Sequence, residues 1–266
     1  MVESLQALLR EIIDYAGLFP PAKLSMETAV RSYLRYKNGP EDWLVGRFVC
    51  PATRLRELDT HLERAEITDE IRLCITGRGG DDAQSFLRNT IADLAEVRDK
   101  CRRTKPEFFE VRVPAVTLNA NGFGRLLTEL KRRSGDLEVV LELPFTTDWR
   151  EDIPAAIKRI ALSNGFKVKI RTGGVEPSAF PMPEQVALFI SCCAANDISF
   201  KATAGLHHPV RTFDESVGGE MFGFFNVFFA AMVAKFFRSD TGIVEQILKE
   251  AGVNRDSCLV LKEARR

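Results

Sequence analysis

The sequence predicts an α/β protein, a single-domain (β/α)8 TIM barrel that spans residues 1–266 and ends in a helical C-terminal extension. Short β-rich runs alternate with longer helical stretches, the order expected of βαβ units in a parallel sheet. The length of 266 residues lies in the range of single α/β barrels. No G-x-G-x-x-G motif follows the first strand, which disfavours an open nucleotide-binding sheet, and no low-complexity linker divides the chain.

Strands are expected where apolar and polar side chains alternate with a period of two. In the run FKVKIRT, for example, the apolar residues share one face and the lysines and arginine share the other. Six further runs can be read as strands in the same way. In chain order, the expected strands are Ile12–Leu18, Trp43–Cys50, Ile71–Gly77, Phe108–Pro114, Leu137–Pro144, Phe166–Thr172 and Ile198–Gly205.

Helices are expected between these strands, because each intervening segment is long enough for a crossover in a parallel sheet. The expected helices are Met26–Tyr36, Thr53–Arg64, Asp81–Cys101, Phe123–Arg133, Ile153–Ser163 and Glu184–Asn196. An eighth strand is expected near Met221–Asn226, followed by helices at Val227–Arg238 and Gly242–Ala251. An eighth strand would close the barrel.

The polar face of each strand is expected to point into the barrel, because the apolar face must meet the helices. A barrel interior is normally filled with branched apolar side chains. A charged interior is explained either by a structural ion-pair network or by a substrate site. Four of its residues come late in their strands, at the mouth where barrel enzymes keep their active sites. The four are Glu110, Lys169, Arg171 and Lys201, and the other interior residues are Asp14, Arg72, Arg112, Glu138, Glu142 and Lys167.

Composition excludes several classes of function. Basic and acidic residues both total 37, so no net charge favours nucleic acid or an anionic membrane as a partner. The most apolar run, FGFFNVFFAAMVAKFF, is too short to span a bilayer, and no cleavable leader is evident, so a cytoplasmic protein is expected. This phenylalanine-rich run offers a surface for a subunit contact, which leaves a homo-oligomer open.

The six cysteines form no C-x-x-C pair. They are typical of reduced thiols in a cytosolic protein, so we expect neither a zinc cluster nor any other cofactor.

Two lysines in neighbouring buried strands predict a specific chemistry. A lysine free in water has a pKa of about 10.4. A second cation beside the lysine in a poorly solvated site lowers that pKa. The neutral amine can then attack a carbonyl group and form a Schiff base. Glu110, on a nearby strand, is placed to act as a general acid or base. We therefore expect a small-molecule carbonyl compound as the partner of Lys169 and Lys201.

Several short stretches resemble deoxyribose-phosphate aldolase, a class I aldolase and (β/α)8 lyase, in the same chain order. KIRTG resembles that family's Schiff-base motif, and KATAG resembles its second-lysine motif. FEV falls where the family has an acidic residue, here glutamate in place of aspartate. The matching stretches are Ile13–Ala22, Phe48–Leu55, Phe109–Val111, Val139–Pro144, Lys169–Gly173 and Lys201–Gly205.

This resemblance implies a role for each matched residue. Lys169 would form the Schiff base, Lys201 would lower its pKa, and Glu110 would relay protons. Thr172, Gly173 and Gly205 complete the two lysine motifs and are expected to line the substrate site. The implied activity is that of an aldolase-like carbon–carbon lyase acting on a small aldehyde or ketone, and whether the substrate carries an acidic group stays open.

The sequence departs from the family where the family binds phosphate. No serine pair follows Gly223, and Phe224 and Phe225 are bulky, which argues against a phosphorylated substrate. Other groups are available to hold a carboxylate, or a phosphate placed differently. These groups are Arg171, His207, His208 and Arg211.

Some assignments stay open at the level of sequence. Asp14 is either a structural anchor between neighbouring strands or part of the catalytic proton network. It is grouped with the substrate-binding residues. Adjacent histidines such as His207 and His208 rarely ligate one metal, so a loop role or substrate contact is expected for them. Two other functions remain: a metal-dependent enzyme that uses these histidines with Glu110 and Glu142, and a barrel that binds an anionic metabolite without turnover.

Overall fold

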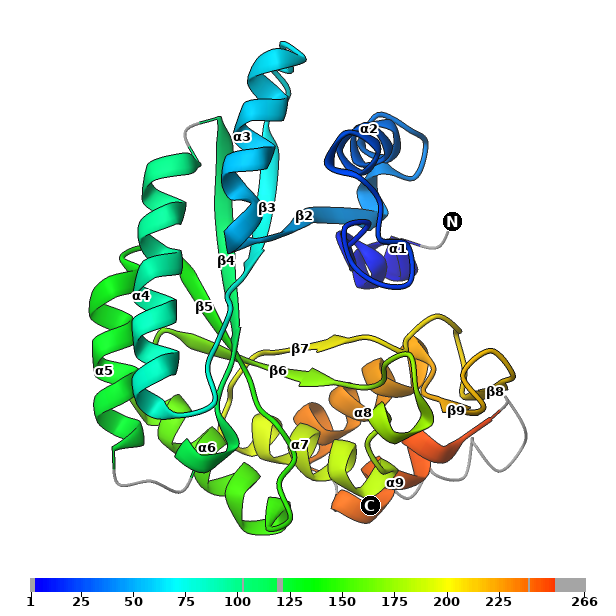
Figure 1. Cartoon of the computed structure of the whole chain (residues 1–266). Coiled ribbons are helices and arrows are strands. Elements are labelled where there is room, and N and C mark those ends of the chain that lie inside the picture. The colour runs from blue at the N-terminus through cyan, green and yellow to red at the C-terminus, as the bar shows by residue number, and fades with distance from the viewer. Residues whose placement is uncertain (1–2, 102, 119–121, 239, 252–266) are drawn as a thin grey trace. The chain divides into compact units, whose positions relative to one another are not determined.

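The computed structural model describes residues 3–101, 103–118, 122–238 and 240–251. Seven strands form one parallel sheet whose strand order follows the chain from β1 to β7, and β8 and β9 form a separate pair (Figure 1). This order confirms the predicted α/β barrel class. The strands are β1 Ile13–Tyr15, β2 Val45–Pro51, β3 Ile71–Thr76, β4 Thr104–Arg112, β5 Glu138–Glu142, β6 Phe166–Arg171, β7 Phe200–Thr203, β8 Thr212–Asp214 and β9 Gly219–Met221.

Helices separate the strands as the sequence predicts. They are α1 Glu3–Leu9, α2 Met26–Lys37, α3 Leu55–Arg64, α4 Ala83–Lys100, α5 Phe123–Ser134, α6 Trp149–Ser163, α7 Pro183–Ala195, α8 Phe224–Phe237 and α9 Thr241–Lys249. In the described ranges, no helix is both long and apolar enough to cross a membrane.

The chain divides into two compact units, of which the first comprises Met1–Gly80, Gln84–Arg112 and Leu130–Val139. Strands β1 to β4 are parallel neighbours within it, and α2 contacts β2 and α3. The odd-numbered residues of β3, such as Leu73, are fully buried. Helix α3 buries Leu55, Leu58 and Leu62, whose spacing places them on one helical face. Apolar residues at strand and helix periods therefore form this core.

The second unit comprises Asp81–Ala83, Val113–Glu129 and Val140–Arg266. Strands β6 and β7 run parallel within it, and helices α6 to α9 lie together on one side of them (Figure 1). Val168 and Ile170 of β6 are fully buried, and Phe200 of β7 meets Phe189 of α7 with ring centroids 5.6 Å apart. The even-numbered residues of these strands thus face the helices, and the odd-numbered residues point to the opposite side.

The expectation of an eighth strand near Met221–Asn226 is wrong. Residues Gly219–Met221 form β9, which pairs antiparallel with β8, and α8 begins at Phe224. Within the described residues, the segment contributes one isolated parallel bridge, between His208 and Gly223. The sequence misled because a short, continuously apolar run has no periodicity that separates a buried strand from a buried helix.

Other differences concern element boundaries. The sequence predicts a helix from Ile153, whereas α6 begins at Trp149 and includes Pro154. Helix α1 was not expected at all, and β4 begins at Thr104, before the expected Phe108. The expected single-domain span stays a prediction.

Candidate active site

The two lysines that the sequence singled out are direct neighbours in the second unit. Lys169 of β6 pairs with Lys201 of β7 in the parallel register, and the next odd-numbered pair is Arg171 with Thr203. Neighbouring strands lie about 4.8 Å apart, and paired residues project from the same face. Since the face of the even-numbered residues packs on the helices, both lysines project from the other face of the sheet.

Glu142 completes a row of three ionisable groups across β5, β6 and β7. Its Oε2 lies 3.1 Å from Nζ of Lys169. Glu142 is 8% exposed and Lys169 is 7% exposed, whereas Lys201 is partly buried. When all three are ionised the row carries two positive charges and one negative, so the loss of one proton from a lysine leaves it neutral. Sequence reasoning placed Glu142 in the interior but did not identify its contact with Lys169.

The residue pairs Thr172–Gly173 and Ala204–Gly205, which follow the two lysines, connect the ends of β6 and β7. Thr172 is fully buried, and its Oγ1 donates a hydrogen bond of 2.6 Å to the carbonyl oxygen of Ala204. A Cβ on Gly173 would lie 2.9 Å from Cα of Gly205, which adopts a positive φ of 74°. These glycines are therefore required where two loops touch, a structural reason for the motif.

Ala204 adopts a φ of 65°, a left-handed conformation that is unfavourable for a residue with a Cβ. It lies between the end of β7 and Gly205, one residue beyond Thr203. Strained backbone of this kind tends to gather at functional sites, where the surrounding structure holds it in place.

The expected anion-holding groups of the second unit do not share one environment. Nε2 of His208 lies 3.3 Å from Oδ2 of Asp214, and Nε of Arg211 lies 3.3 Å from Oε2 of Glu220. His207 and Arg171 are exposed. Two of the four candidates are thus already paired with carboxylates of the β8–β9 hairpin.

The start of α8 is also occupied. The backbone N–H of Phe224 donates a hydrogen bond to the carbonyl oxygen of His208, and that of Phe225 donates one to the carbonyl oxygen of Pro209. Both hydrogen bonds are 3.0 Å long. A Cβ on Gly223 would lie 2.3 Å from Cα of Val210, so the loop packs directly on the helix start. The amides that a helix N-terminus commonly offers to an anion are in part bonded within the protein.

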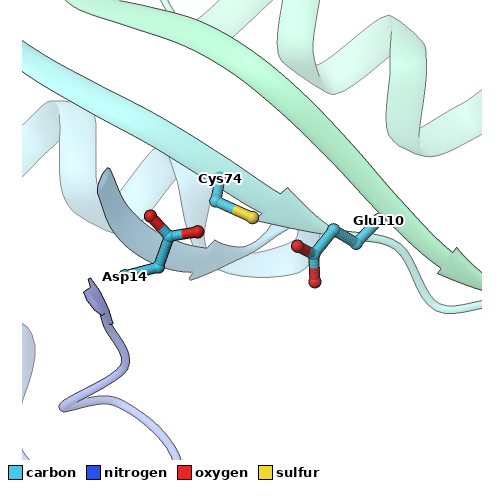
Figure 2. A group of neighbouring side chains, drawn as sticks. All are labelled: Asp14, Cys74 and Glu110. Atoms are coloured by element: carbon cyan, nitrogen blue, oxygen red, sulfur yellow. The ribbon is translucent and has the colours of Figure 1, made fainter. Parts of the chain in front are cut away.

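In the first unit, Asp14 of β1, Cys74 of β3 and Glu110 of β4 converge (Figure 2). Their ligand atoms all lie within 4.8 Å of one another, close enough to hold one metal ion. Cys74 is fully buried and Glu110 is 4% exposed. The sequence predicted Glu110 and Asp14 as interior residues and expected no metal, whereas Cys74 had no predicted role.

Asp14 is fixed to the neighbouring strand. Its Oδ1 accepts a hydrogen bond of 2.9 Å from the backbone N–H of Arg47. The close approach requires a glycine at position 46, where a Cβ would lie 2.6 Å from the same oxygen. This contact supports the structural-anchor interpretation of Asp14, and its place beside Glu110 keeps the proton-network interpretation open.

A second charged group of the first unit is an ion-pair network that also reaches Asp14, whose Oδ1 lies 3.7 Å from Nη1 of Arg47. Arg72 contacts Glu107 through Nε at 2.7 Å and also pairs with Glu11, while Nε of Arg47 lies 2.7 Å from Glu107. The hydrogen bond from Arg72 lowers the pKa of Glu107 and likewise that of Glu11, and these two carboxylates raise the pKa of Arg72. The network accounts for Arg72 as a structural residue.

No protein-family model matches the chain, and no curated protein matches it significantly. Among solved structures, the aldolase QR15 matches with a TM-score of 0.54 and 16% sequence identity, covering 79% of this chain and 85% of that chain. The carboxyl transferase domain of Rhizobium etli pyruvate carboxylase, solved with pyruvate, matches with a TM-score of 0.46 and 9% identity, covering 89% of this chain and 37% of that chain. The first likeness shows an aldolase-like fold.

Proposed function

We propose that this protein is a class I aldolase-like lyase, which forms a Schiff base between Lys169 and a small aldehyde or ketone. The observation that carries the proposal is the direct pairing of Lys169 with Lys201 on neighbouring strands. A second ammonium group on the neighbouring strand disfavours protonation of both lysines where the site is poorly solvated. The aldolase-like fold and the two lysine motifs support the same function.

The chemistry follows from the amine. Neutral Lys169 attacks the carbonyl carbon, and the resulting carbinolamine loses water to give an imine. The β-hydroxyl group of the bound substrate then loses its proton, the adjacent carbon–carbon bond breaks, and that fragment leaves as an aldehyde while the protonated imine accepts the electron pair and becomes an enamine. Protonation of the enamine carbon and hydrolysis release the second carbonyl product and the free lysine. Each step moves a proton, so an acid–base group must lie within hydrogen-bond reach of the reacting nitrogen.

Glu142 meets that requirement within the second unit, because it lies 3.1 Å from Nζ of Lys169. We assign it the first proton transfer, from the carbinolamine nitrogen. Lys201 remains charged and balances the carboxylate. The role of Glu110 as a second proton relay stays the prediction that the resemblance implies.

The test is intact-mass spectrometry after borohydride reduction, with a panel of small aldehydes and ketones over a pH series. Wild type should gain one reduced adduct, and Lys169→Ala should gain none. Lys201→Leu should lose the adduct at neutral pH and recover it in part in alkaline buffer, because Lys169 then protonates more readily. Lys167→Ala, on the same strand and face, is the matched control and should label as wild type does.

Two outcomes would contradict the proposal. If wild type traps no carbonyl compound, the lysines act only through their charge, and the protein binds an anionic metabolite without turnover. If Lys169→Ala is labelled as well as wild type, the reactive amine lies elsewhere.

A metal-dependent activity is the second candidate, and the group of Asp14, Cys74 and Glu110 is the observation that favours it. These residues differ from the set that the sequence suggested, since His207 and His208 are not part of the group. Elemental analysis of the purified protein, with Cys74→Ser as the comparison, separates the two candidates. A stoichiometric metal that this variant loses would favour the second.

A further inference from the structure

Thr203 lies beside the lysine pair and was not singled out by the sequence. It is two residues beyond Lys201 on β7, on the same face, and pairs in register with Arg171. Two residues along a parallel strand correspond to about 6.6 Å. Arg171 and Thr203 therefore form a second pair on the site face, one step closer to the carboxyl ends of the strands.

The hydroxyl group of Thr203 is buried, and it has no hydrogen-bond partner within the described part of the chain. Thr172 is different, because its hydroxyl donates to a backbone carbonyl oxygen. A buried hydroxyl that loses water without gaining a partner is unfavourable, so native structures rarely keep one without a reason. Next to it in register, Arg171 supplies an exposed cation that forms no ion pair in the described ranges.

We propose that Arg171 and Thr203 form a subsite for the carboxylate at the far end of a short-chain oxo acid whose carbonyl carbon reacts with Lys169. The proposal rests on the proposed function and adds the substrate class. The Thr203 hydroxyl donates one hydrogen bond to the carboxylate, and the guanidinium of Arg171 donates two, the geometry that guanidinium groups favour.

The spacing of the two pairs sets the length of the substrate. A separation of about 6.6 Å between side-chain rows corresponds to roughly four or five carbon–carbon bonds of about 1.5 Å each. The subsite thus fits an oxo acid of about five carbons, such as 5-oxopentanoate. A carboxylate subsite at this position also agrees with the start of α8, where two backbone amides that could bind a terminal phosphate already donate hydrogen bonds within the protein.

The experiment compares 5-oxopentanoate with pentanal, an uncharged aldehyde of the same length, in borohydride trapping. Wild type should trap the oxo acid at least about 10-fold more efficiently, since hydrogen bonds to charged groups are worth about one to two factors of ten. Thr203→Val and Arg171→Gln should each remove about 10-fold or more of this preference while trapping pentanal as wild type does.

Thr90→Val is the matched control. Thr90 is also fully buried with an unpartnered hydroxyl in the described structure, but it lies on α4 of the first unit. It should leave both trapping rates unchanged. The thermal midpoint of Thr203→Val should stay within a few degrees of wild type, which separates a lost ligand contact from a lost structural one.

Binding of glutarate, a dicarboxylate that cannot form an imine, tests the subsite apart from the chemistry. Weaker glutarate binding by Thr203→Val than by wild type supports the subsite, whether or not any carbonyl compound is trapped. A failure to trap any carbonyl compound would overturn only the proposed function. Equal trapping of 5-oxopentanoate and pentanal by wild type, or equal loss of both in Thr203→Val, would overturn the subsite and leave the Schiff base intact.

Discussion

The charged network of the first unit and the charged row of the second unit arise from the same sequence pattern but use different cations. Arg47 and Arg72 face Glu11 and Glu107 in the first unit, with paired atoms as close as 2.7 Å. In the second unit, Glu142 lies against Lys169, whose neighbour in the sheet is another lysine. The network joins arginines to carboxylates, whereas the row places two lysines side by side with one carboxylate against Lys169.

The side chains themselves reinforce this difference. A guanidinium group stays protonated in proteins and pairs with carboxylates through two parallel hydrogen bonds, which suits a permanent structural contact. An ammonium group can lose its proton when its surroundings disfavour the charge, and the amine is then a nucleophile. Strand alternation thus predicts which residues share a face, and the identity of the cation indicates whether that face is structural or chemical.

The largest expected effect concerns the carboxylate that moves protons. Glu142→Gln should slow formation of the imine, and turnover with it, by about 100- to 10,000-fold, the usual contribution of general acid–base catalysis. The measurement is the exchange of α-hydrogen atoms for deuterium in a free carbonyl compound incubated with the protein without borohydride, followed by NMR. Glu138→Gln, which removes an exposed carboxylate of the same strand, is the control.

The same assay compares the two units. Glu110→Gln changes the carboxylate that the resemblance implies, and Glu142→Gln changes the one that contacts Lys169. If only Glu110→Gln slows the exchange, Glu142 is a counter-ion and the proton relay belongs to the residue that the sequence indicated. If only Glu142→Gln slows the exchange, the assignment of the proton transfer to Glu142 is supported.

The next effect is on stability and belongs to the first unit. Arg72→Met leaves Glu11 and Glu107 with one cation fewer in a partly buried place, which should lower the free energy of unfolding by about 1–3 kcal/mol. Trapping of carbonyl compounds should be unchanged. Denaturant unfolding measures the first quantity and mass spectrometry the second. A stability equal to that of wild type would mean that the network contributes no net free energy.

The pH dependence of that loss has a definite sign. Because Arg72 lowers the pKa of Glu11 and Glu107 in the folded state, their contribution is present above the unfolded pKa of about 4.3 and is lost as the pH falls through the folded value. The difference in stability between wild type and Arg72→Met should therefore be largest near neutral pH and shrink below about pH 4. A difference that grows in acid would contradict this linkage.

Sequence reasoning reached the strands and their faces because alternation is a local property. It placed Lys169 and Lys201 on adjacent strands, and the structure pairs them directly in the parallel register. It missed the contact of Glu142 with Lys169, because the register between two strands depends on the helix and loops that connect them. It likewise missed the bond from the Arg47 amide to Asp14, since nothing local to either residue specifies it.

The smallest expected effect tests whether the strained backbone beside the lysine row serves the site. Ala204 and Glu66 both adopt positive φ, at 65° and 51°, but Glu66 lies in the first unit just after α3. Glycine removes the left-handed strain and adds freedom to the unfolded chain, so Ala204→Gly and Glu66→Gly should each change the unfolding free energy by less than about 1 kcal/mol. Only Ala204→Gly should also slow trapping by a few-fold, because it loosens the turn that fixes Thr203 and Gly205. Denaturant midpoints and trapping rates measured side by side check both statements, and an equal effect of the two variants on trapping would show that the strain at Ala204 is ordinary turn geometry.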